Sequence, residues 1–131
     1  MVDMLEQGAI WLDDQRHLHM TRAVDYVRGT STVGVQATVG KTVFEQADDY
    51  GIVQKTETRD FLIRTQDLVL DAQITLPQRG DLVRETEGTT TFVYEVLAPG
   101  SEPVFRYSDP YRKTLRIHTK HIATEPPLPL Q

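Results

Sequence analysis

From Thr21 to Ile122, apolar and polar residues alternate in short runs that are separated by Gly, Pro and Asp. A period of two is typical of β-strands with one buried face, and no segment in this range shows ten or more residues of helical period. Tight turns join antiparallel neighbours, whereas parallel strands need long crossover connections. We therefore expect about seven short, mainly antiparallel strands that form a small all-β sandwich or barrel.

The clearest hairpin is the stretch from Leu76 to Val96, LPQRGDLVRETEGTTTFVYEV. Gly80 and Gly88 are expected to take positive φ angles in its turns. The tripeptide Arg79-Gly80-Asp81 is interpreted as a turn and not as an adhesion signal, because Gly supplies the dihedral angle and Asp a side-chain hydrogen bond. The returning strand carries three residues that we expect in the core: Phe92, Tyr94 and Val96.

Other runs predict further strands at 23–29, 33–39, 42–46, 55–66 and 113–122. A loop is expected at 46–51, where the composition is polar. Alternation also pairs Val83 with Glu85 on one face of their strand. Four further residues are expected to point inward: Phe61, Ile63, Leu115 and Ile117.

The two ends of the chain differ from the centre. Leu5, Ala9 and Leu12 recur at helical spacing behind Asp3, a possible N-cap, so a short N-terminal helix is expected. The terminal EPPLPLQ is expected to be extended, because proline interrupts helices and strands. We expect one domain, 1–131, with a helical arm at 1–20, a β core at 21–122 and a tail at 123–131.

Composition excludes several classes of protein. The chain has no cysteine, which removes disulfides, thiolate nucleophiles and cysteine-ligated zinc. Its hydrophobic content of 39% and charged content of 25% are those of a soluble globular domain. No apolar run approaches the roughly 18 residues of a membrane span, and the N-terminus lacks the features of a secretory signal. We expect no membrane association.

Charge is unevenly distributed. The net charge is −5, which argues against a surface that coats nucleic acid throughout. Between Val104 and Ile122, however, the sequence contains five Lys and Arg residues and one Asp, so this segment has a net charge of +4. The rest of the chain therefore has a net charge of −9. A basic segment therefore accompanies an acidic body.

No catalytic constellation is recognisable. His17 and His19 could ligate a metal, but residues at i and i+2 of a helix lie on different faces, so a solvated helix end is the simpler interpretation. The three serines lie in turn-like sequence without a nucleophile pattern, and no glycine pattern for phosphate binding is present. We expect no enzyme activity, cofactor or metal.

The basic segment interleaves cations with Tyr107 and Tyr111. Such a pattern suits a groove for single-stranded nucleic acid, where cations attract the backbone and aromatic rings stack on bases. It also suits a face that docks on the acidic surface of a neighbouring subunit, where complementary charge sets the orientation of the two molecules. The acidic body favours the subunit contact, since it would repel a polyanion.

Three stretches carry a resemblance to a known family: LPQRGDLV, TFVYEVLAPG and RYSDPYRKTLRIHTK. Together with MLEQGAIWL, they resemble the lambda-type head–tail joining proteins of phages and prophages, also called head-closure or neck proteins. The resemblance implies a small β-sandwich or barrel that assembles as a ring, usually six-fold, around the DNA exit channel. It implies a portal or adaptor protein and a tail-completion or tail terminator protein as partners, with DNA passing without sequence-specific binding. The expected location is the virion neck, after assembly in the host cytoplasm.

The resemblance identifies regions and no catalytic residues. The expected contacts with subunits or adaptor are Arg106, Tyr107, Asp109, Tyr111, Arg112 and Arg116. The expected channel-facing loop comprises Asp48, Asp49 and Tyr50. The alternative function is an oligonucleotide-binding barrel that uses the basic, aromatic-flanked strand.

Overall fold

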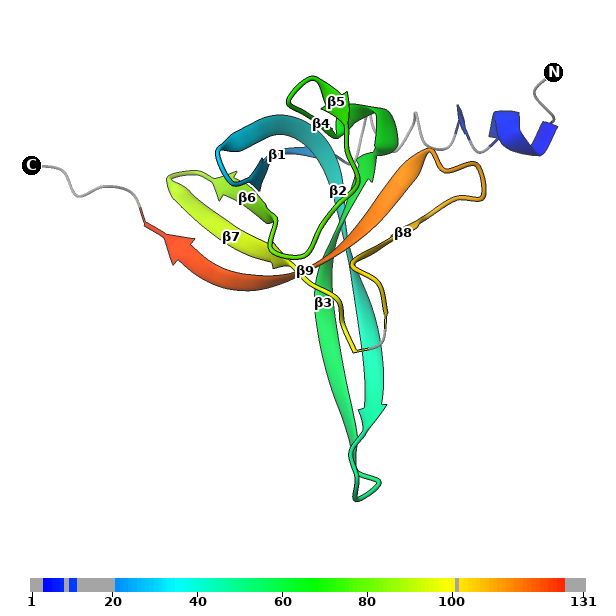
Figure 1. The fold of residues 1–131 in the computed structure, drawn as a ribbon, viewed down its shortest axis with the longest axis vertical. Coiled ribbons are helices and arrows are strands. Elements are labelled where there is room, and N and C mark those ends of the chain that lie inside the picture. The colour runs from blue at the N-terminus through cyan, green and yellow to red at the C-terminus, as the bar shows by residue number, and fades with distance from the viewer. Residues whose placement is uncertain (1–3, 9, 12–20, 101, 127–131) are drawn as a thin grey trace, which may run out of the picture.

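Antiparallel strands make up most of the computed structural model, which describes residues 4–8, 10–11, 21–100 and 102–126 (Figure 1). The described chain contains one 3₁₀ turn, η1, at Thr65–Asp67. Its nine strands are β1 (Arg22–Arg28), β2 (Ser31–Ala47), β3 (Val53–Arg64), β4 (Val69–Leu70), β5 (Gln73–Ile74), β6 (Leu82–Glu87), β7 (Thr90–Val96), β8 (Phe105–Tyr107) and β9 (Thr114–Glu125). The expected all-β, antiparallel class is confirmed.

Strand β9 closes the sheet into a barrel. The hydrogen-bonded order is β3-β2-β1-β6-β7-β9, and β9 pairs in turn with β3. The first half of β9 pairs with β3 and the second half with β7, while β8 adds to the free side of the first half. Closure satisfies backbone groups that would otherwise lie at open edges. Of the two expected architectures, the structure therefore has the barrel.

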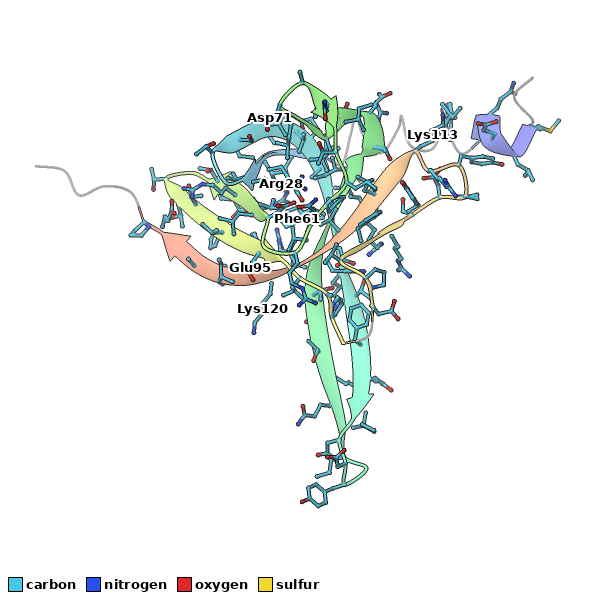
Figure 2. All side chains as sticks on the ribbon, viewed as in Figure 1. Arg28, Phe61, Asp71, Glu95, Lys113 and Lys120 are labelled. Atoms are coloured by element: carbon cyan, nitrogen blue, oxygen red, sulfur yellow. The ribbon has the colours of Figure 1, made fainter. Side chains whose placement is uncertain are left out.

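Inward-pointing side chains fill the barrel. The predicted core residues Phe61, Ile63, Leu115 and Ile117 are completely buried. Tyr94 and Val96 are buried as well, and Phe92 packs partly buried against the same cluster. Figure 2 shows Phe61 within the ring of strands and Lys120 outside it. The alternation in the sequence thus assigned the interior correctly.

The β6–β7 hairpin has the turns expected for it. Gly80 and Gly88 have φ angles of +92° and +60°, which glycine adopts without steric cost. The Asp81 carboxylate accepts hydrogen bonds from the Gln78 amide at 2.9 Å, from Arg28 at 2.8 Å and from the Tyr26 hydroxyl. Burial raises the pKa of Asp81, but these donors outweigh it and lower that pKa overall. Asp81 is therefore an internal anchor of the turn.

Several strand boundaries differ from those expected; the strand expected at 55–66, for example, is β3 at Val53–Arg64 and is followed by η1. Residues 33–39 and 42–46 belong to one continuous strand, because Gly40 stays extended and pairs with Asp60. That strand changes neighbours near Ala37, where its pairing with β1 ends and its pairing with β3 begins. Strand β9 continues to Glu125, since its last residues pair with β7.

The expected N-terminal helix is present at residues 4–8 and 10–11. Leu5 is 80% exposed, so the described chain does not cover the apolar face predicted there. No described helix has the length and apolar content to cross a membrane. Several expectations lie outside the described residues, namely those for Asp3, Ala9, Leu12, His17, His19 and the tail at 127–131.

A charged group lies inside one end of the barrel. Glu85 is 1% exposed and points inward with Val83, as the alternation indicated. Arg59 donates to Glu85 at 2.7 Å, and Arg22 donates to the same carboxylate. The Arg59 guanidinium also lies 5.1 Å from the centre of the Tyr94 ring. The buried carboxylate is thus neutralised by two cations from different strands.

We expect Arg59→Met to lower the free energy of unfolding by about 3 kcal/mol, because it leaves the Glu85 carboxylate poorly compensated. Adding Glu85→Met should recover most of that loss, since an apolar pair of similar volume needs no compensation. Urea unfolding of both variants measures the effect. The exposed pair Lys41–Glu57 provides the control, because Lys41→Met should change stability by less than about 0.5 kcal/mol. A double variant no more stable than Arg59→Met would contradict this account.

Candidate functional site

The hairpin of β2 and β3 projects beyond the barrel as a two-stranded arm, residues 43–57 (Figure 1). Strand β2 leaves β1 at Ala37, and β3 pairs with β9 only from Arg59, so the arm has no third strand beside it. Every residue from Ala47 to Glu57 is exposed. Because isolated two-stranded hairpins are marginally stable in water, the arm depends on its attachment to the barrel.

A buried carboxylate anchors the base of the arm. Asp60 is fully buried and accepts hydrogen bonds from Arg116 at 2.6 Å and from His118 Nδ1 at 2.9 Å. The hydroxyls of Thr58, at 2.7 Å, and Thr42 also donate to it. Burial raises the pKa of Asp60, but the donors prevail and lower that pKa to about 2. One ionised carboxylate therefore ties together β2, β3 and β9.

An aromatic contact adds to this anchor. Phe44, near the base of the arm, packs edge-on against the His118 ring with the ring centres 5.4 Å apart. His118 itself is 2% exposed. The direction of the arm relative to the barrel is consequently set by the buried polar cluster around Asp60 and by the packing of Phe44 on His118.

The tip of the arm is a turn organised by Asp48. Its carboxylate accepts from the amides of Tyr50 and Ile52, both at 2.9 Å, and Gly51 has a φ angle of +77°. Asp48 is thus engaged within the turn, whereas Asp49 and Tyr50 project outward and Tyr50 is 90% exposed. All three residues expected to face a channel lie at this tip, and their facing a channel remains a prediction.

The β8–β9 turn is organised in the same way by Asp109. Its carboxylate accepts from the amides of Tyr111 at 3.1 Å, Lys113 at 2.9 Å and Thr114 at 2.9 Å. Arg112 has a φ angle of +59°, a conformation that non-glycine residues rarely adopt. Its guanidinium lies 5.7 Å from the centre of the Tyr107 ring. The turn therefore holds the Arg112 side chain outside the barrel in a defined position.

The expected contact residues differ in their exposure, and their role in contacts remains a prediction. Arg106 and Arg112 are exposed, and Tyr107 and Tyr111 are half-buried. Arg116 instead donates to Asp60, with only 22% of its side chain exposed. The positive charge counted along the sequence is thus partly neutralised inside the molecule.

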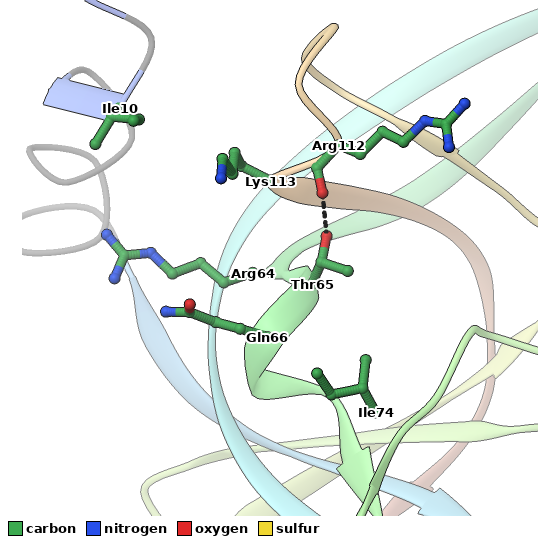
Figure 3. Close-up of a pocket in the computed structure, with 7 residues that line it drawn as sticks. All are labelled: Ile10, Arg64, Thr65, Gln66, Ile74, Arg112 and Lys113. Carbon is green, nitrogen blue, oxygen red and sulfur yellow. Dashed lines mark hydrogen bonds between the residues drawn. The ribbon is translucent and has the colours of Figure 1, made fainter. Parts of the chain in front are cut away.

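A pocket lies beside the β8–β9 turn (Figure 3). It has a volume of about 360 Å³. The Thr65 hydroxyl donates to the Arg112 carbonyl oxygen at 2.9 Å and joins η1 to the turn. The described residues that line the pocket are Ile10, Arg64, Thr65, Gln66, Ile74, Arg112 and Lys113. Its lining therefore combines two isoleucines with three cations and includes no carboxylate among these residues.

Sequence patterns did not reveal two of these features. The Asp60 cluster joins residues that lie 56 and 58 positions apart, and the pocket draws on four separate segments. The one available signal for the cluster was a charged pair, Arg59 and Asp60, directly before the apolar run FLI at 61–63. That signal does not identify the partners, because no local period relates them.

A family model described as "Phage head-tail joining protein" matches residues 2–126. The match includes the barrel, the arm and the β8–β9 turn. No curated protein matches the chain.

The anchor at Asp60 gives a prediction for stability. Because its pKa is lowered from 3.8 to about 2, the ionised carboxylate stabilises the fold above about pH 4, and this contribution is lost as the pH falls toward 2. Asp60→Asn should lower the free energy of unfolding by about 2 kcal/mol at pH 7 and by much less at pH 2. Urea unfolding at both pH values measures this difference.

Glu57→Gln is the matched control, since Glu57 is an exposed arm residue whose contact with Lys41 at 3.5 Å should contribute little. Equal stability of Asp60→Asn and the wild-type chain at pH 7 would show that the cluster does not anchor the arm.

Proposed function

Because the chain belongs to the phage head-tail joining protein family, we propose that it forms a ring, six-fold when assembled, between the portal or adaptor protein and the tail-completion or tail terminator protein. The observation that carries this proposal is the family match over residues 2–126. In this position the protein surrounds the channel through which DNA leaves the head. It assembles from the host cytoplasm into the neck of the virion.

The shape of the subunit suits a ring. A closed barrel offers no long open edge for uncontrolled pairing, whereas the arm and the β8–β9 turn project from it in different directions (Figure 1). Head-to-tail contacts join different surfaces of the same molecule, and they generate a ring when the rotation closes. A molecule with an acidic arm tip and a basic turn has two such surfaces.

The charge distribution also supports passage of DNA. The net charge of −5 gives the assembled protein a negative field. Phosphate contacts would retain DNA in the channel, so a negative wall favours its release. In such a ring the tip residues Asp48, Asp49 and Tyr50 can face the channel or contact the neighbouring copy.

The alternative, an oligonucleotide-binding barrel, receives less support from the basic strand. Nucleic-acid grooves combine free cations with open aromatic faces. Here Arg116 is bound to Asp60, and the Tyr107 ring packs against Phe105 and Arg112. A salt-sensitive affinity for single-stranded DNA would revive this alternative.

The test is in vitro joining of heads and tails from the phage that encodes the chain, with this gene inactivated. Extracts that lack the protein should accumulate separate DNA-filled heads and tails, and the purified protein should restore joined particles. Electron microscopy counts both populations. Failure of the wild-type protein to restore joining would refute the proposed function.

The basic turn gives a more local prediction. Arg106→Glu combined with Arg112→Glu should reduce the yield of joined particles at least about tenfold, because it reverses two exposed charges at a proposed contact with subunits or adaptor. Arg79→Glu reverses an exposed charge in another turn and serves as the control. Circular dichroism should show that both variants are folded. Unchanged joining by the double variant would remove Arg106 and Arg112 from the interface.

A further inference from the structure

The arm tip has a cluster of exposed apolar side chains. Tyr50, Ile52 and Val53 are 90%, 59% and 57% exposed at the end of a ribbon without other cover. Clustered apolar side chains on a surface commonly mark a contact with another molecule. We propose that the tip inserts into the pocket beside the β8–β9 turn of a neighbouring copy, a contact that rests on the ring of the proposed function.

The tip presents a negative charge next to its apolar residues. Asp48 is engaged by the amides of the turn, whereas Asp49 has no partner among the described residues. The side chain of Asp49 therefore remains available to a cation on another molecule. If the tip faced an aqueous channel, the Asp49 charge would be hydrated, but Tyr50, Ile52 and Val53 would remain in contact with water, which is unfavourable for apolar side chains.

The pocket has the complementary chemistry. Ile10 and Ile74 provide apolar surface, and Ile74 is 65% exposed. Three cations surround them: Arg64, Arg112 and Lys113. Its volume of about 360 Å³ lies in the range of about 300–1,000 Å³ that is usual for binding pockets. An apolar group that carries a carboxylate at its edge matches this lining.

An arm tip that fills this pocket must come from another copy. In Figure 1 the arm of the same chain extends to the end of the molecule opposite η1 and β5, which border the pocket. Contact between a tip and a different surface on the next copy is heterologous, so repetition produces a closed ring or an open chain. The geometry thus offers one way in which successive copies are joined.

The contact is small, so it should be weak between free copies and strong only when a partner gathers them. Interfaces well below about 1,200 Å² are typically transient, and a shared platform raises the effective concentration of each copy. Assembled particles are therefore the appropriate sample for the experiment.

The absence of cysteine from the chain makes crosslinking specific. The double variant Ala47→Cys/Gln66→Cys, whose first cysteine directly precedes the tip and leaves Asp49 intact, is incorporated into joined particles and treated with a short bis-maleimide. If the tip occupies the neighbouring pocket, denaturing gels should show a ladder of covalent multimers. Either single variant should give no product larger than a dimer, because a chain with one cysteine can be linked to only one other chain. The control Ala47→Cys/Thr89→Cys, which places the second cysteine in the exposed β6–β7 turn, should give no ladder.

A charge exchange provides the second measurement. Asp49→Arg and Lys113→Glu should each reduce the yield of joined particles about tenfold, and their combination in one chain should restore it to within about threefold. Asp25→Arg, a change of the same kind at an exposed position on β1, should have no effect.

The two proposals fail in different ways. If wild-type protein does not restore joining, the proposed function is wrong. If joined particles form but Ala47→Cys/Gln66→Cys yields no more multimers than its control, or the charge exchange gives no recovery, the tip does not occupy the neighbouring pocket.

Discussion

The structure depends on the position of β9 between two strands that are distant in the sequence. Its first half pairs with β3 and its second half with β7, and this double pairing closes the sheet. Because β3 joins β9 only from Arg59 onward, the preceding part of the β2–β3 hairpin is left without a neighbour and extends as the arm. Closure of the barrel and projection of the arm are therefore consequences of one arrangement of backbone hydrogen bonds.

Charged side chains reinforce this arrangement from inside and outside. Within the barrel, Glu85 connects β6 to Arg59 of β3 and Arg22 of β1. On the outer face, Asp60 connects β3 to Arg116 of β9. Buried ion pairs stabilise a fold less than their geometry suggests, but the loss of one partner is costly, so they disfavour other registers of the same strands. The charge of +4 counted between Val104 and Ile122 consequently overstates the positive charge that a partner protein meets, because Arg116 is paired with Asp60.

Rigid attachment of the arm favours the docking that we propose for its tip. An arm held by Asp60, His118 and Phe44 presents its tip in a fixed direction, which lowers the conformational entropy that docking would remove. Asp48 and Asp109 do the same for the tip and for the β8–β9 turn, where each carboxylate binds backbone amides. The two projecting surfaces are thus ordered before any partner arrives.

The alternation of apolar and polar residues by itself determined the all-β class, the inward positions of Phe61, Ile63 and Leu115, and the placement of Glu85 on the same face as Val83, because side-chain alternation is a local property of an extended chain. That this face points inward was decided by the tertiary structure. Glycine likewise determined the turns at Gly80 and Gly88. Only the tertiary structure decided that β2 is a single strand, that Arg116 is bound to Asp60, and that four separate segments border one pocket. These features depend on which strands lie side by side, and no local period in the sequence encodes that choice.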